Sequence, residues 1–250
     1  RPQEAIGPFM DALARKPDHV ASHVQLGNAF QRLEMHEEAM QCHSTTATLE
    51  PENPAYASAA LFEALHACRW DQVAELRAQL DARLAKRPDA GAIPFMVVAS
   101  SSSRVQHHAV ATAFARAQFG NLEPLPQIKR SARANECIRL AYLSNDLHQH
   151  ATAYLIAELF EKHDRRRFDL TLYSYGRDDG SAMPRRLQDA ADHFVDVARQ
   201  SDRDIAERIR ADGIDILVDL KGYTYQARPT VLAYRPAPVQ VNFLGYPGTM

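Results

Sequence analysis

The feature that most constrains the fold of this chain is a 34-residue unit near its N-terminus, which recurs before and after itself. The unit covers residues 20–53 and reads VASHVQLGNAFQRLEMHEEAMQCHSTTATLEPEN. A glycine and an alanine at fixed places let two helices approach closely, an aromatic ring fills the gap between them, and a proline stops the second helix. The unit therefore predicts a pair of packed helices. Its defining residues are Leu26, Gly27, Phe30, Ala39 and Pro51.

This pattern is that of tetratricopeptide repeats, and it extends in both directions. One repeat length back, Ala5 and Pro17 match it, so we expect the chain to begin on the second helix of a repeat, with residues upstream. One repeat length forward, a weaker copy predicts a helix from Trp70 to about Leu84. Residues 1–86 are thus predicted to form a helical array, a scaffold type that usually binds partner proteins or peptides. A generic helical bundle is the alternative.

The rest of the chain divides into a connector and an α/β region. Residues 87–136 are predicted to be a helical connector, with one helix at 105–119 and a charged, exposed segment at 129–135. From residue 137 onward, strand-like runs alternate with helical ones, which implies a parallel sheet in a Rossmann-like lobe. We expect this lobe, residues 137–250, to be incomplete at its C-terminal end. The predicted strands are 138–144, 168–175, 194–197, 214–220 and 239–244, and the predicted helices are 154–163, 201–211 and 230–234.

The composition excludes several classes of protein. The formal net charge of -2 over 250 residues does not suggest a nucleic-acid or membrane-surface binder. The three cysteines are far apart and show no metal-ligand spacing, so neither a disulfide framework nor a zinc site is expected. This use of cysteine leads us to expect the chain in the reducing cytoplasm. No run of 18 or more apolar residues occurs and the first residues lack the apolar core of a signal peptide, so no transmembrane helix and no membrane partner are expected.

Three predicted strands end in segments suited to ligand contacts, because ligands of open parallel sheets bind at the carboxyl ends of the strands. These segments are 144–152, 221–224 and 245–249, and we expect them to face one crevice. Simple chain reversal is the alternative for the two turns that contain glycine. The candidate substrate-binding residues are Asp146, His148, Thr152, Lys221, Gly222, Tyr223, Tyr246, Pro247, Gly248 and Thr249.

His148 and His150 are candidates for acid–base chemistry. A histidine near the N-terminus of a helix is favoured in its neutral form, and a neutral imidazole can accept a proton from a hydroxyl group. The alternative is that either histidine caps the next helix or faces water. The acid pair Asp202 and Asp204 resembles a metal-binding motif, but we expect it to open a helix. No glycine-rich dinucleotide or P-loop motif occurs in the sequence.

Three segments of the second half resemble O-GlcNAc transferases: SNDLHQHATAYL at 144–155, DGIDILVDLKGYT at 212–224 and RPAPVQVNFLGYPGT at 235–249. The order of parts, tetratricopeptide repeats before a GT-B glycosyltransferase region, is also similar. The resemblance covers nearly the whole chain, and RPAPVQ followed by LGYPGT is a specific combination. The short loops suggest a bacterial homologue.

The resemblance implies an α + α/β fold in which residues 137–250 are the N-terminal lobe of a GT-B enzyme. It implies inverting transfer of N-acetylglucosamine from UDP-GlcNAc to Ser or Thr hydroxyls of proteins, with no metal or other cofactor. His150 matches the family histidine beside the sugar, so it is the candidate general base or acceptor-positioning residue. Acceptor proteins would lie along the repeat groove, and a second lobe would supply most nucleotide contacts. The fragment alone is expected to be inactive.

Two departures from the family pattern leave alternatives open. Vertebrate members carry proline after the histidine and a second histidine four residues later, where this chain has Ala151 and Tyr154. A single histidine therefore bears the catalytic hypothesis. The SPINDLY proteins share the architecture but transfer fucose from GDP-fucose, so another sugar nucleotide is one alternative. A catalytically silent scaffold that binds proteins through its repeats is the other.

Overall fold

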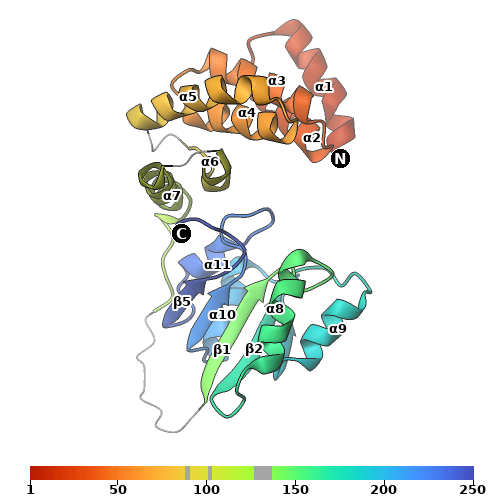
Figure 1. Ribbon diagram of the computed structural model, residues 1–250, viewed down its shortest axis with the longest axis vertical. Coiled ribbons are helices and arrows are strands. Elements are labelled where there is room, and N and C mark those ends of the chain that lie inside the picture. Colours follow the sequence, from red (N-terminus) through yellow and green to blue (C-terminus); the bar gives the residue numbers. More distant parts are fainter. Residues whose placement is uncertain (88–90, 101–102, 127–136) are drawn as a thin grey trace. The chain divides into compact units, whose positions relative to one another are not determined.

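The computed structural model describes residues 1–87, 91–100, 103–126 and 137–250. The chain forms two compact units, Arg1–Gln118 and Phe119–Gly248 (Figure 1). The predicted charged segment 129–135 lies outside the described residues. No helix in the described ranges is long and apolar enough to span a membrane.

The first unit is a succession of helices, of which the first five pack each against the next along the chain and the sixth packs against the fourth. Gly27 and His43 mark one crossing, because a Cβ atom at Gly27 would lie 2.7 Å from the His43 ring. Ala39, predicted to be small at this crossing, is fully buried. The predicted repeat is therefore confirmed as helix pairs. The helices are α1 (Pro2–Arg15), α2 (Val20–Arg32), α3 (His36–Leu49), α4 (Pro54–His66), α5 (Trp70–Lys86), α6 (Pro94–Ser100) and α7 (Arg104–Phe119).

The second unit is a five-stranded, all-parallel sheet in the order β3-β2-β1-β4-β5. Helices cover both faces (Figure 1). Buried side chains of α8 and α9 form one core with the sheet, and those of α10 and α11 form the other. The strands are β1 (Ile138–Ser144), β2 (Phe168–Ser174), β3 (His193–Asp196), β4 (Ile216–Asp219) and β5 (Val239–Asn242), and the helices are α8 (Ala151–Lys162), α9 (Ala182–Asp189), α10 (Asp202–Ala211) and α11 (Pro229–Ala233).

The main differences from prediction concern three helices. The sequence did not predict α6, in which Pro94 occupies the first helical position, where a missing N–H breaks no helical hydrogen bond. It also missed α9, a short helix with Pro184 in its first turn. Helix α8 was predicted from Tyr154 but begins at Ala151, because His150 caps it. Ala151 and Thr152 are therefore helical residues and not part of the preceding loop.

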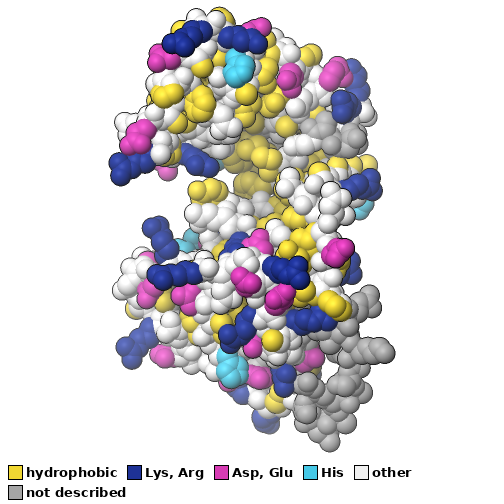
Figure 2. All heavy atoms as spheres, turned by 180° about the vertical axis from the view of Figure 1, so that it is seen from behind, with side chains coloured by type: hydrophobic (Ala, Val, Ile, Leu, Met, Phe, Trp, Pro, Cys, Tyr) yellow, Lys and Arg dark blue, Asp and Glu magenta, His cyan; other side chains and the backbone are white. Residues whose placement is uncertain are grey.

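Charged side chains of both signs lie intermixed on the visible face of the α/β unit (Figure 2). This distribution agrees with the formal net charge of -2. On the part of this face that the structure describes, no large patch of a single sign stands out.

Candidate functional site

The loops after β1 and β4 meet at the point where the order of the sheet reverses. Strand β1 pairs with β2 on one side and with β4 on the other, so the two connections diverge there. Ligands of open α/β sheets bind in the crevice at such a point. Two hydrogen bonds join these loops: Lys221 Nζ donates to Asp146 Oδ2 at 2.8 Å, and Asn145 Nδ2 donates to Gln226 Oε1 at 2.9 Å. The predicted convergence of these two segments is confirmed.

Asp146 and Lys221 form a buried ion pair. Their side chains are only 7% and 8% exposed. The backbone N–H of Asp146 donates to Ser144 Oγ at 3.0 Å, which fixes the chain as it leaves β1. Two charges withdrawn from water are tolerated only when they are paired, so each residue holds the other in place.

The turn after β4 is organised by the buried carboxylate of Asp219. It accepts hydrogen bonds from the backbone N–H groups of Lys221 at 3.1 Å and Gly222 at 2.7 Å, and from Asn242 Nδ2 at 3.1 Å. Burial raises the pKa of Asp219, against the opposing effect of these donors and of Lys221. The carboxylate thus fixes the backbone that carries Lys221 into the crevice.

The third segment reaches the same turn through Tyr246. Its ring is buried and lies edge-on to Tyr223, with 5.5 Å between ring centroids. Gly222 has a φ of +58°, and a Cβ atom there would lie 2.4 Å from Tyr246 Cβ. A Cβ atom on Gly248 would likewise lie 2.6 Å from the Tyr246 ring. The two glycines therefore shape the turns around one tyrosine, while Pro247 and Thr249 are exposed.

His150 is the N-cap residue of α8. Its Nδ1 atom accepts a hydrogen bond from the backbone N–H of Thr152 at 3.2 Å, and it lies 3.6 Å from Asp146 Oδ2. The side chain is 43% exposed. The His148 ring lies beside it, with 5.8 Å between centroids. The structure thus brings both candidate histidines to the edge of the crevice, next to the buried ion pair.

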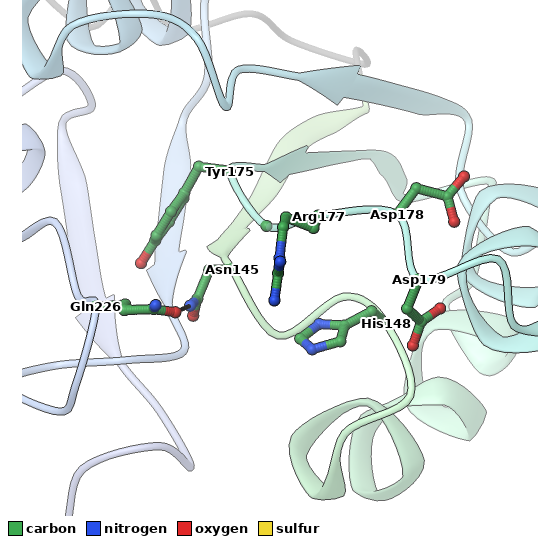
Figure 3. A pocket seen from close by; sticks show the side chains of 8 residues that line it. Asn145, His148, Tyr175, Arg177, Asp178, Asp179 and Gln226 are labelled. Atoms are coloured by element: carbon green, nitrogen blue, oxygen red, sulfur yellow. Dashed lines mark hydrogen bonds between the residues drawn. The ribbon is translucent and has the colours of Figure 1, made fainter. Parts of the chain in front are cut away.

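A cavity of about 560 Å³ has His148 in its wall (Figure 3). The Arg177 side chain extends between Asn145 and His148, whereas Asp178 turns away (Figure 3). The carboxylate of Asp179 accepts hydrogen bonds from the backbone N–H groups of Gln149 and Ser181, and its interaction with Ser181 chiefly lowers its pKa to about 2. The cavity is lined by Asn145, His148, Tyr175, Gly176, Arg177, Asp178, Asp179 and Gln226.

The acid pair at the start of α10, Asp202 and Asp204, makes contacts within the fold. Asp204 forms a capping box with Ser201, and Asp202 pairs with Arg228. The expectation that these acids open a helix is confirmed. Among the residues that the structure describes, no three His, Cys, Asp or Glu side chains lie close enough together to hold a metal ion.

Sequence reasoning missed several residues that shape the crevice. Asn145 and Gln226 bridge the two loops, Asp219 holds the turn, and Tyr175 and Arg177 follow β2. Except for Gln226, which lies further along the loop between β4 and α11, each lies at or just after the end of a strand, a position that could have drawn attention to it. Their pairings depend on the order of the strands in the sheet.

Comparison with known proteins gives consistent matches. A family model described as "Glycosyl transferase family 41" matches residues 101–250. A probable UDP-N-acetylglucosamine–peptide N-acetylglucosaminyltransferase SEC of Arabidopsis thaliana is 35% identical over 140 residues, which are 56% of this chain and 14% of that protein. A UDP-N-acetylglucosamine–peptide N-acetylglucosaminyltransferase of Caenorhabditis elegans is 38% identical over 120 residues, 48% of this chain and 10% of that protein.

A solved structure extends the similarity over both units. It is a mutant O-GlcNAc transferase of Thermobaculum terrenum, which matches with a TM-score of 0.64 and 28% sequence identity. The match covers 95% of this chain and 46% of that chain. The chain thus spans less than half of the solved protein, and a smaller share of the curated relatives.

Proposed function

This chain belongs to glycosyl transferase family 41, and we propose from that premise that it is part of a protein O-glycosyltransferase. The proposed reaction transfers N-acetylglucosamine from UDP-GlcNAc to Ser or Thr hydroxyls with inversion and without a metal ion. The observation that carries the proposal is the position of His150, the residue that matches the family histidine. It lies at the switch point of the sheet, beside the buried pair of Asp146 and Lys221.

The crevice is suited to the acceptor side of such a reaction. In an inverting transfer, the acceptor oxygen bonds to the anomeric carbon as the bond to the diphosphate breaks, UDP leaves, and the hydroxyl proton passes to a base. His150 is exposed enough to meet a substrate and is the candidate general base or acceptor-positioning residue. A second lobe is proposed to hold the nucleotide, and the helical unit to hold the acceptor polypeptide along its groove.

Calorimetric titration of UDP and UDP-GlcNAc into the complete protein and into this chain tests the proposal. We expect binding to the complete protein, with transfer to a peptide carrying Ser or Thr. His150→Ala is expected to retain donor binding and to lose transfer. Wild-type-level turnover in that variant would contradict the role assigned to His150. Absence of donor binding to the complete protein would contradict UDP-GlcNAc as the donor.

A transferase with another sugar nucleotide is the second candidate, because the SPINDLY proteins, to which this chain is also similar, share its architecture. Ala151 and Tyr154 beside the histidine motivate a third candidate, a catalytically silent scaffold. Thermal-shift measurements with UDP-GlcNAc, GDP-fucose and UDP-glucose distinguish the donors. A ligand at about 100 times its dissociation constant adds roughly 2.7 kcal/mol of stability, which is a measurable shift. A protein that responds to none of them and transfers no sugar would instead be a silent scaffold.

A further inference from the structure

The cap of α8 determines which nitrogen of His150 carries a proton. Nδ1 lies 3.2 Å from the backbone nitrogen of Thr152 and accepts its hydrogen bond. A backbone N–H can only donate, so Nδ1 must present its lone pair. In a neutral imidazole the single hydrogen then belongs to Nε2.

From this geometry we infer that His150 acts as a neutral hydrogen-bond donor: its Nε2–H fixes an oxygen of a bound substrate. The ring does not take the proton of the acceptor hydroxyl, which passes instead to an oxygen of the departing diphosphate. The inference rests on the proposed transferase function and refines the role of His150 within it. A general base would need a free lone pair on the nitrogen that faces the substrate. Here the lone pair of the ring is committed to the cap, and the N–H group belongs to a side chain that is 43% exposed.

The buried ion pair disfavours the opposite arrangement. If Nδ1 carried the proton and donated it to Asp146, Nε2 would be free to act as a base, as in a histidine oriented by a carboxylate. The distance from Nδ1 to Asp146 Oδ2 is 3.6 Å, which is too long for a hydrogen bond. The same oxygen already accepts from Lys221 Nζ at 2.8 Å. Asp146 and Lys221 are therefore positioning residues that leave the His150 ring to the cap.

Nitrogen-15 NMR of this chain with labelled histidine measures the tautomer directly, with His150→Gln identifying the resonances. We expect an unprotonated Nδ1 and a protonated Nε2 in the neutral ring. A protonated Nδ1 in the neutral ring would overturn the inference. This readout does not depend on transfer, so it decides the tautomer even if the proposed donor or reaction is wrong.

Two matched variants of the complete enzyme separate capping from donation. Asn is a good N-cap but places its amide near the position of Nδ1, whereas the longer Gln can place an N–H near Nε2. We expect His150→Gln to keep activity within about tenfold of wild type, and His150→Asn to fall at least tenfold further. Stability should follow the opposite order, with the Asn variant unfolding at the higher urea concentration. An equal loss of roughly 10²–10⁴-fold in both variants would indicate a general base instead.

Lys221→Met tests the positioning role with a readout that structural damage alone does not move. Without the ammonium, Asp146 is free to accept from Nδ1–H, so the fraction of His150 protonated at Nδ1 should rise. An unchanged tautomer in folded Lys221→Met would remove Lys221 from the proposal. If this variant does not fold, the wild-type spectrum still decides the tautomer.

The KM values of the His150→Asn variant show which substrate carries the oxygen that Nε2–H binds. A rise in KM for the donor assigns this oxygen to the sugar nucleotide, and a rise in KM for the peptide assigns it to the acceptor.

Discussion

Lys221→Met should destabilise the α/β unit far more than an ordinary surface lysine substitution. The change removes the ammonium at 2.8 Å from Asp146 and leaves a carboxylate that is only 7% exposed. The next cationic candidate, His150, lies 3.6 Å away and is engaged in the helix cap. A buried charge deprived of its partner costs about 3–5 kcal/mol, so we expect a loss of that size.

Hydrogen exchange under increasing urea is a suitable assay, because the single tryptophan, Trp70, lies in the helical unit and does not report on the sheet. Amides of β1 and β4 flank the pair and report directly on the α/β unit. With a slope of about 2 kcal/mol per molar urea, a loss of 3–5 kcal/mol lowers the midpoint by about 1.5–2.5 M.

The matched control is Lys162→Met on α8. Lys162 Nζ lies 2.6 Å from Glu158, but the two side chains are 73% and 69% exposed. The control should therefore change stability by no more than about 0.5 kcal/mol. The double variant Asp146→Leu/Lys221→Met removes both charges and should recover most of the loss. If Lys221→Met were no more harmful than Lys162→Met, the argument from a buried ion pair would be refuted.

Three further predictions concern single positions. Gly222→Ala should destabilise the α/β unit by about 2–4 kcal/mol, because it adds left-handed backbone strain and an overlap with Tyr246. The control Gly180→Ala, at φ +70° with open space around it, should cost only the strain, so equal shifts in melting temperature for the two variants would contradict the overlap. Burial, and to a smaller extent the charge of Glu38, raises the pKa of Cys42 to about 11, so its neutral thiol contributes stability below pH 9 that is lost as the pH rises towards 11. Thiol labelling at pH 8 should therefore modify the exposed Cys68 and Cys137 but spare Cys42. The pKa of Asp179 is lowered to about 2, so the stability that its carboxylate gives the loop is present above pH 4 and lost as the pH falls towards 2. An NMR titration that showed the Asp179 carboxyl protonating near pH 4 would contradict its hydrogen bonds with Ser181 and Gln149.

Much of the fold was predictable because its signals are local. The repeat residues Gly27 and Ala39 specify close helix crossings, and both are buried in them. Strand β1 spans the residues predicted for it, 138–144, because an apolar run bounded by polar residues marks a buried strand. The missed helices α6 and α9 are short and contain proline at or near their N-termini, where the periodic signal is too brief to separate from a turn.

The candidate site was predictable only in part. Sequence pattern places Asp146, His150 and Lys221 at the carboxyl ends of strands, and it allows a cap by His150, since the hydrogen bond to Thr152 spans two residues. It does not assign partners. Asn145 with Gln226 and Tyr223 with Tyr246 are contacts between loops that follow different strands.

The sequence by itself determined the helix pairs, the alternation of strands and helices, and which residues follow each strand, because these depend on spacing and on the conformational preferences of neighbouring residues. Tertiary structure alone decided that Lys221 neutralises Asp146 across 75 residues of chain. That pairing exists because β4 lies beside β1 in the sheet. Strand order is fixed by how two helical layers bury the faces of the sheet, and no local pattern encodes it.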